Sequence, residues 1–185
     1  PRGVRDQSSL TRAIHHVTKV DPYELVRVAD VGDVPFTSLY DLERCHEEIV
    51  SHVSHLVASD STVLAVGGDH SITYPLLEGT LRGSGGSAAA PPIACIHVDA
   101  HTDTWDTFYG TKLHHGAPFR RAVEAGLLDP RKIVQIGIRG AQNSDEGWRY
   151  CDDMGFTVVW CEDVHREVGA RARALAHLWR VGRGR

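Results

Sequence analysis

Short, continuous apolar runs alternate along the chain with stretches in which apolar residues recur every three or four positions. Such runs predict buried strands, and such spacing predicts amphipathic helices. Strands are expected at five ranges: 25–31, 62–66, 93–98, 132–138 and 156–160. Helices are expected at four: 38–58, 71–82, 117–125 and Glu162 to roughly Leu178, the first with Ser38 and Asp41 as its capping box.

This alternation of strands and helices predicts an α/β fold. Continuously apolar strands are typical of a parallel sheet whose two faces are both covered, so we expect three layers, α-β-α, around a mostly parallel sheet. In such folds, ligands bind where loops leave the carboxyl ends of the strands. Neither an internal repeat nor a second domain is visible, and we expect residues 1–185 to form a single domain.

Composition narrows the class of protein. The chain is 42% hydrophobic and 24% charged, with a formal net charge of -4, which fits a globular domain that binds neither nucleic acid nor membrane. The apolar runs are too short to span a bilayer, and no secretory signal opens the chain. The four cysteines contain no C-x-x-C pair, so zinc-ribbon spacing is absent. We therefore expect a cytoplasmic protein, although a targeting segment lost before Pro1 remains an alternative.

Candidate metal ligands follow two of the predicted strands. His70 comes after the glycine pair 67–68, and Asp99, His101 and Asp103 come directly after the strand at 93–98. In an extended segment the last three would project to one side. Imidazole and carboxylate ligands together suit a divalent ion such as Mn²⁺ better than the thiolate sites of structural zinc do.

These residues also have structural interpretations that involve no metal. A lone histidine after a strand is usually structural, and a lone D-x-H-x-D pattern is only suggestive. Together, at two consecutive strand ends, the two patterns favour a metal site. Three other histidines, His15, His16 and His97, are interpreted as structural, and three aromatic residues as pocket walls: Trp105, Phe108 and Tyr109.

Two segments, VGGDHSITYPLLEG and HVDAHTDTWDTFYGTKLHHGAPFRRAVEAGLLDPRKIVQIGIRG, closely resemble the ureohydrolases of the arginase and agmatinase family. The resemblance implies an arginase/deacetylase-like fold with two manganese ions. By this match His70, Asp99 and Asp103 would bind one ion, whereas Asp99 and His101 would bind the second. Asp99 would then bridge the two ions.

Within this family the resemblance is closest to agmatinases. Residues 104–110 lack the serine-glycine-asparagine element of arginases, and residues 114–119 look like the agmatinase version. The implied reaction is agmatine plus water to putrescine and urea, in which Asp103 orients the attacking hydroxide and His115 carries a proton to the leaving amine. Two alternatives stay open: a guanidinobutyrase or related guanidino-acid hydrolase, and a catalytically dead fragment that binds one metal or a partner subunit.

The resemblance also implies that parts of the family domain are missing. No later pair of alternating aspartates is found, and residues 171–185 form a divergent, arginine-rich basic tail. We therefore expect a partial ureohydrolase domain, truncated at both ends, that holds one manganese ion or fewer and has impaired activity. The complete protein is expected to act on a small guanidino substrate and to form a homo-oligomer.

Overall fold

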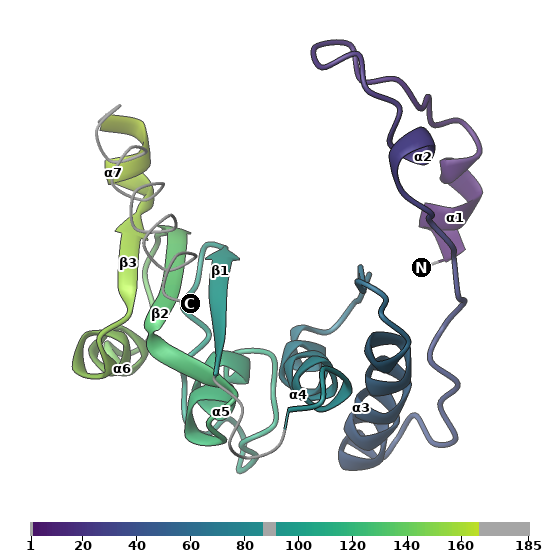
Figure 1. Cartoon of the computed structure of the whole chain (residues 1–185). Helices are drawn as coiled ribbons and strands as arrows, with labels where there is room; N and C mark the ends of the chain where they lie inside the picture. The colour runs from purple at the N-terminus through teal and green to yellow at the C-terminus, as the bar shows by residue number, and fades with distance from the viewer. Residues whose placement is uncertain (1, 87–91, 167–185) are drawn as a thin grey trace. The chain divides into compact units, whose positions relative to one another are not determined.

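The computed structural model describes residues 2–86 and 92–166, without the side chains of residues 165 and 166 (Figure 1). Contacts divide the chain into two compact units, Pro1–Pro35 and Phe36–Arg185. The candidate ligands all belong to the second unit. Among the described residues, no helix is long and apolar enough to cross a membrane.

The amino-terminal unit contains two short helices, α1 (Arg2–Ser8) and α2 (Pro22–Leu25). The Arg5 guanidinium forms ion pairs with Asp30 and Asp33, at 2.6 and 2.7 Å. The strand predicted at 25–31 is wrong, since Leu25 ends α2 and residues 26–31 form no strand. No described segment pairs with them, and a strand requires a partner for its backbone hydrogen bonds.

The second unit begins with two packed helices, α3 (Leu42–Ala58) and α4 (Thr73–Gly83). The Asp41 side chain caps α3 by accepting a hydrogen bond from the Arg44 amide, so the helix predicted at 38–58 is confirmed with a later start. Gly79 lets the helices approach closely, because a Cβ there would lie 2.9 Å from the Val50 carbonyl oxygen.

The strand predicted at 62–66 is also wrong. These residues pair with no described strand, and Leu64 is 90% exposed. The apolar run was correctly recognised, but an apolar run becomes a strand only where a neighbouring strand is available to it.

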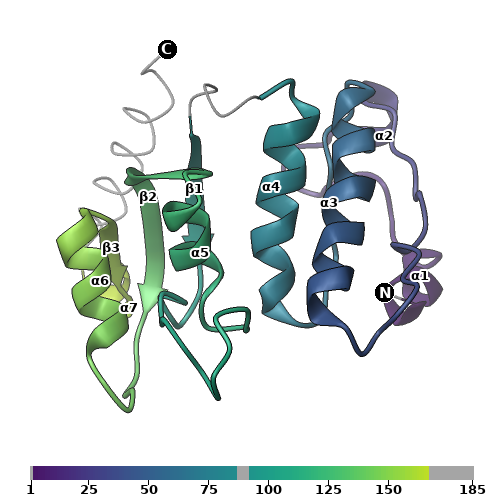
Figure 2. The ribbon, with the colours of Figure 1, turned by 90° about the horizontal axis from the view of Figure 1, so that it is seen from below.

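The sheet has three parallel strands in the order β1 (Ile93–Val98), β2 (Leu128–Ile138) and β3 (Thr157–Trp160). Helix α5 (Pro118–Glu124) connects the first two strands, and α6 (Glu146–Met154) connects the last two. Helix α7 (Cys161–Arg166) confirms the start of the last predicted helix, whose continuation lies outside the described residues. Figure 2 shows α5 lying across the sheet beside α4.

Helix α6 was not predicted. Its apolar residues Trp148, Cys151 and Met154 recur every three positions, a helical spacing that went unrecognised over so short a segment. It ends at Gly155, whose φ of 83° is the left-handed conformation that glycine commonly adopts after a helix.

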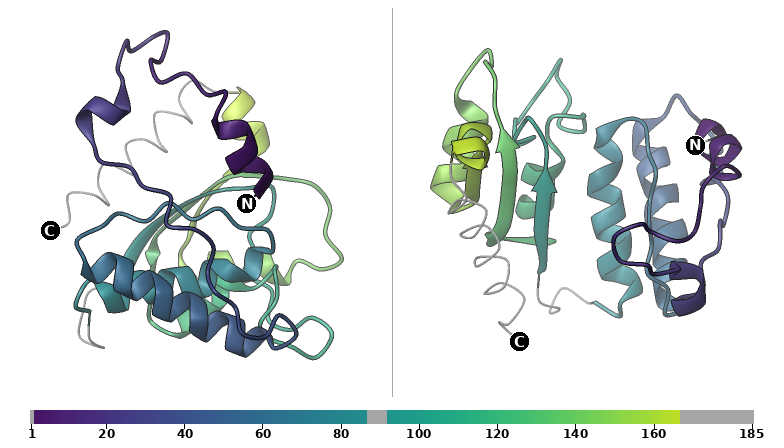
Figure 3. Two further views of the ribbon diagram at one scale, coloured as in Figure 1. Left: turned by 90° about the vertical axis from the view of Figure 1, so that its right-hand side faces the viewer. Right: turned by 90° about the horizontal axis from the view of Figure 1, so that it is seen from above.

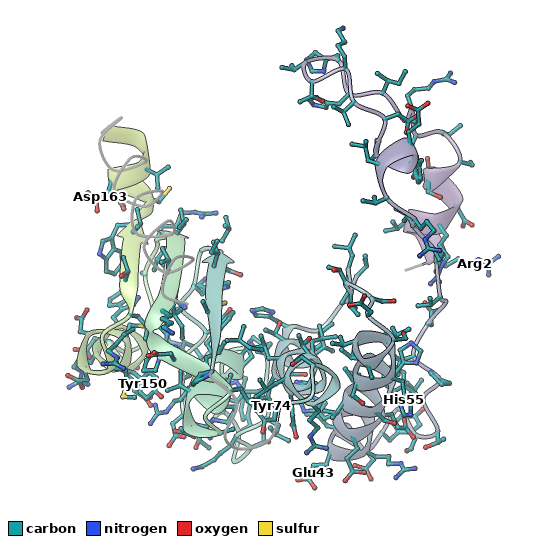
Figure 4. The ribbon with its side chains drawn as sticks, viewed as in Figure 1. Arg2, Glu43, His55, Tyr74, Tyr150 and Asp163 are labelled. Carbon is teal, nitrogen blue, oxygen red and sulfur yellow. The ribbon has the colours of Figure 1, made fainter. Side chains whose placement is uncertain are left out.

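The core lies between the sheet and its helices. Figure 3 shows these helices beside the sheet. Phe119 of α5, Ile133 of β2 and Cys151 of α6 belong to one buried cluster. Tyr74 of α4 and Tyr150 of α6 pack against this cluster (Figure 4). The Arg120 guanidinium lies over the ring of Tyr150, 4.6 Å from its centroid.

The opposite side of β1 is open within the described part of the chain. Ile96 and Val98 are 58% and 74% exposed, whereas Cys95 and His97, which alternate with them, face inward. The predicted α/β class and parallel sheet are therefore confirmed, with the layers incomplete.

Candidate metal centre

His70 opens a short 3-10 helix, η1 (His70–Ile72), directly before α4. The Asp69 carboxylate caps this turn by accepting a hydrogen bond of 2.9 Å from the Ser71 amide. The Thr73 hydroxyl lies 3.1 Å from Nδ1 of His70. The cap and the hydroxyl hold the imidazole so that its other nitrogen, Nε2, faces Asp103, with 2.9 Å between Nε2 and Oδ2.

Asp103 lies in the loop that leaves the carboxyl end of β1. Its backbone is left-handed, with φ of 51°, a conformation that aspartate tolerates better than most residues. The side chains before and after it, Thr102 and Thr104, are fully buried. The Thr104 hydroxyl donates a hydrogen bond of 2.9 Å to the Gly147 carbonyl at the start of α6, which anchors the loop on that helix.

Four side chains converge at this edge of the sheet. Within the described part of the chain, the ligand atoms of His70, His97, Asp99 and Asp103 lie within 4.8 Å of one another. The structure therefore brings together three of the four predicted metal ligands and adds His97, which the sequence analysis interpreted as structural.

The fourth predicted ligand, His101, lies outside this cluster. Its side chain is 61% exposed, and its Nδ1 lies 3.7 Å from Oδ1 of Asp99. Residues 99–101 form a bend rather than an extended segment, so the alternating projection expected for Asp99, His101 and Asp103 does not hold. The backbone amide of His101 instead donates to Oδ1 of Asp99, at 2.9 Å.

The predicted proton carrier, His115, is exposed and lies in the loop before α5. Its ring packs edge-on against Phe108, with 5.7 Å between the ring centroids. The same loop is tied to the segment after β1, since the Trp105 amide donates to the Gly116 carbonyl at 2.9 Å. The role of His115 stays a prediction.

The fully buried Gln135 is hydrogen-bonded to the ring of His97 on the side away from the carboxylates. The two residues lie opposite each other on the paired strands β1 and β2, and the Gln135 amide nitrogen is 3.2 Å from Nδ1 of His97. That nitrogen also donates to the Thr102 carbonyl oxygen at 2.7 Å. Gln135 therefore links the strand to the loop that carries Asp103.

The two histidines of the cluster experience opposite electrostatic effects. The Asp103 carboxylate raises the pKa of His70 above its ordinary value, despite partial burial. Burial lowers the pKa of His97, although the nearby carboxylates of Asp103 and Asp99 act in the other direction. Burial thereby disfavours the charged form of His97.

Sequence reasoning missed His97 and Gln135, although both left a signal. His97 precedes Asp99 by two residues, so strand alternation already placed it on the same side as that aspartate. Gln135 is a polar residue inside the apolar run KIVQIGI. A polar residue that is buried in a strand requires a hydrogen-bonding partner, and here the partner is His97.

The donor set fits a divalent metal ion. The cluster combines imidazoles with two carboxylates, a ligand set that suits Mn²⁺ among the first-row metals. Nε2 of His70 is buried and makes no hydrogen bond of good geometry, although it lies 2.9 Å from Oδ2 of Asp103. Unpaired polar atoms facing carboxylates are a costly arrangement that a bound cation would relieve.

The chain is an α/β protein with a cluster of candidate metal ligands at one edge of its sheet, and comparison with known proteins identifies its family. The model of the Arginase family matches residues 1–181, across both units of the chain. The chain therefore belongs to the arginase family.

Its curated relatives act on several guanidino compounds, judging by their names. The chain is 43% identical to the mitochondrial agmatinase of Gallus gallus and 42% identical to the mitochondrial guanidino acid hydrolase of Homo sapiens, over 88% of its length in both cases. It is 41% identical to the guanidinopropionase of Pseudomonas aeruginosa over 98% of its length. These alignments cover 46%, 44% and 54% of the relatives, so the chain spans about half of their length.

Solved structures confirm the fold. A hypothetical agmatinase from Burkholderia thailandensis is 35% identical with a TM-score of 0.80, covering 100% of this chain and 54% of that one. Proclavaminate amidinohydrolase from Streptomyces clavuligerus is 31% identical with a TM-score of 0.79, covering 96% and 57%. The family match reaches residue 181, well into the tail that the sequence analysis set apart from Arg171.

Proposed function

We propose that this chain carries one manganese-binding part of a ureohydrolase active site, with agmatine as the substrate of the complete domain. The observation that carries the proposal is the convergence of His70, Asp99 and Asp103 at the carboxyl edge of a parallel sheet. Membership of the arginase family and the names of the relatives supply the reaction class, hydrolysis of a guanidino group.

His70, Asp99 and Asp103 would hold the ion. A bound divalent ion supplies an acidified water that can attack a guanidinium carbon near neutral pH. The Asp103 carboxylate, whose side chain is 11% exposed, would orient that water by accepting a hydrogen bond from it. His115, in the neighbouring loop, would transfer a proton to the leaving amine.

His101 and Asp99 would contribute to a second ion. In this chain Asp99 is the only member of that pair that lies within the four-residue cluster, because His101 is exposed. A second ion would therefore need further carboxylates, since two neighbouring divalent charges repel each other unless anions separate them.

A second substrate class has direct support. The guanidino acid hydrolase of Homo sapiens and the guanidinopropionase of Pseudomonas aeruginosa are nearly as similar to the chain as the agmatinase is. All these substrates share the guanidino group and differ in the tail, which is an amine in agmatine and a carboxylate in the guanidino acids. The metal cluster is expected to serve either class, and the residues that contact the tail decide between them.

The proposal can be tested by measuring urea release. The 185-residue chain loaded with Mn²⁺ would be assayed beside the same chain fused to the carboxyl-terminal part of the Gallus gallus agmatinase. Agmatine and guanidinobutyrate serve as paired substrates. We expect little urea from the chain alone and release from agmatine by the fusion, abolished by Asp103→Asn. A folded fusion that releases urea equally well with Asp103→Asn would show that this cluster does not take part in the reaction.

The tail preference needs a second fusion. Joining the chain to the matching part of the Pseudomonas aeruginosa guanidinopropionase keeps the cluster and changes only the added segment. If the tail is contacted outside this chain, preference should follow the added segment. A preference for agmatine in both fusions would instead place tail recognition within these 185 residues.

A further inference from the structure

His97 lies within the cluster, with a buried Nε2 that makes no hydrogen bond. Two roles are compatible with that position. An unprotonated Nε2 could bind the metal ion, whereas a protonated Nε2 could only donate a hydrogen bond. The role of His97 is therefore decided by which of its two ring nitrogens carries the hydrogen.

The orientation of the Gln135 amide can be fixed first. Its nitrogen lies 2.7 Å from the backbone carbonyl oxygen of Thr102, a group that only accepts hydrogen bonds. Rotating the amide by half a turn would put two oxygens at that distance. The amide oxygen in turn accepts a hydrogen bond from the thiol of Cys151, with 3.5 Å between Sγ and Oε1.

The same amide nitrogen lies 3.2 Å from Nδ1 of His97. Because the amide nitrogen can only donate, Nδ1 must accept and therefore carries no hydrogen. His97 is then a neutral imidazole with its hydrogen on Nε2. That N–H group faces Oδ2 of Asp99 at 3.3 Å and Oδ2 of Asp103 at 3.9 Å.

We propose that His97 is a positioning residue for the two carboxylates rather than a metal ligand, and that Gln135 fixes it in this role. Its Nε2–H group attracts both carboxylates, which reduces their mutual repulsion and holds them together in the cluster. The ligands of the first ion are thereby His70, Asp99 and Asp103. This assignment rests on the metal centre proposed above, and histidines of such centres are commonly oriented through their second ring nitrogen.

The direct test is the tautomer of His97 in the complete 185-residue chain, read from long-range nitrogen–hydrogen NMR correlations of the imidazole. The spectra are recorded without metal and with Cd²⁺ as the probe ion. We expect the hydrogen on Nε2 in both states, and a cadmium–nitrogen coupling at His70 but none at His97. A hydrogen on Nδ1, or a cadmium coupling at His97, would overturn the proposal.

A matched pair of variants tests the role of Gln135. Gln135→Glu replaces the N–H donor by an acceptor, so the hydrogen of His97 should move to Nδ1. Gln142→Glu makes the same change at a half-buried position, where the glutamine accepts from Trp105, and should leave the tautomer of His97 unchanged. An unchanged tautomer in a folded Gln135→Glu chain would contradict the proposal. If that variant does not fold, the spectrum of the unaltered chain still decides.

These experiments separate two kinds of failure. If Cd²⁺ does not bind at all, the metal centre proposed above fails, whereas the tautomer without metal still tests the assignment of His97. If Cd²⁺ binds through His97, the metal centre stands and the positioning role is wrong.

Discussion

The loop after β1 differs between its two halves. Asp103 is flanked by the fully buried Thr102 and Thr104, and the hydroxyl of Thr104 is anchored on the Gly147 carbonyl. In the bend at residues 99–101, by contrast, His101 is 61% exposed and is supported mainly by the neighbouring Asp99. The anchored half therefore holds Asp103 within the cluster, whereas the bend leaves the side chain of His101 in solvent.

The largest loss of Mn²⁺ affinity is expected from substitution of Asp99. Asp99→Asn keeps the shape of the side chain but removes a charge from the cluster, whereas His101→Asn changes an exposed side chain. We expect Asp99→Asn to lower the Mn²⁺ affinity by more than about a hundredfold, above the range for residues that only support a ligand, and His101→Asn by less than about tenfold. Isothermal titration calorimetry measures both affinities. Equal losses would mean that the two halves contribute alike.

A smaller effect is expected for the anchor on α6. A Cβ at Gly147 would lie 2.9 Å from Oγ1 of Thr102 and 3.2 Å from Oγ1 of Thr104. Gly147→Ala should therefore displace the loop and lower the Mn²⁺ affinity about tenfold, as is typical of residues that orient ligands. Gly3→Ala is the control, because a Cβ at Gly3 meets nothing within 4 Å. Unchanged affinity in Gly147→Ala would show that this anchor does not set the position of Asp103.

The smallest effect on the metal is expected for the contact between α3 and α4. A Cβ at Gly79 would lie 2.9 Å from the Val50 carbonyl oxygen and from Cβ of Val53. Overpacking should make Gly79→Ala less stable by about 1–3 kcal/mol in denaturant unfolding, with the Mn²⁺ affinity of the folded chain unchanged. A loss of affinity without a loss of stability would imply that the packing of α4 controls His70.

The sequence predicted the parallel strands of the sheet, and Asp99 and Asp103 at its edge, because these features depend on local patterns. His70 was predicted to follow a strand that does not form, and it reaches the cluster from the 3-10 helix before α4 instead. Apolar runs in β1 and β2 identify the strands, and polar residues directly after a parallel strand lie at its carboxyl edge. The resemblance to ureohydrolases then supplied the metal and the reaction class.

The features that the sequence did not predict share a physical origin. Each of them depends on contacts with residues that are distant in the sequence or on a local bend. The apolar run at 62–66 forms no strand because no described segment pairs with it. The position of His101 depends on a bend that alternation does not predict. Gln135 acquires its role only through the register that places it opposite His97.

The central claim is that this chain by itself assembles a metal site from His70, Asp99 and Asp103. It is tested most directly by the manganese content of the purified chain after equilibrium dialysis, beside that of Asp103→Asn. Asparagine tolerates the left-handed backbone at this position, with φ of 51°, so the variant removes charge without added strain. We predict about one Mn²⁺ per chain, as one such cluster of imidazole and carboxylates implies, and a large loss in the variant. A chain that binds no manganese, or a variant that binds as much as the unaltered chain, would contradict the account.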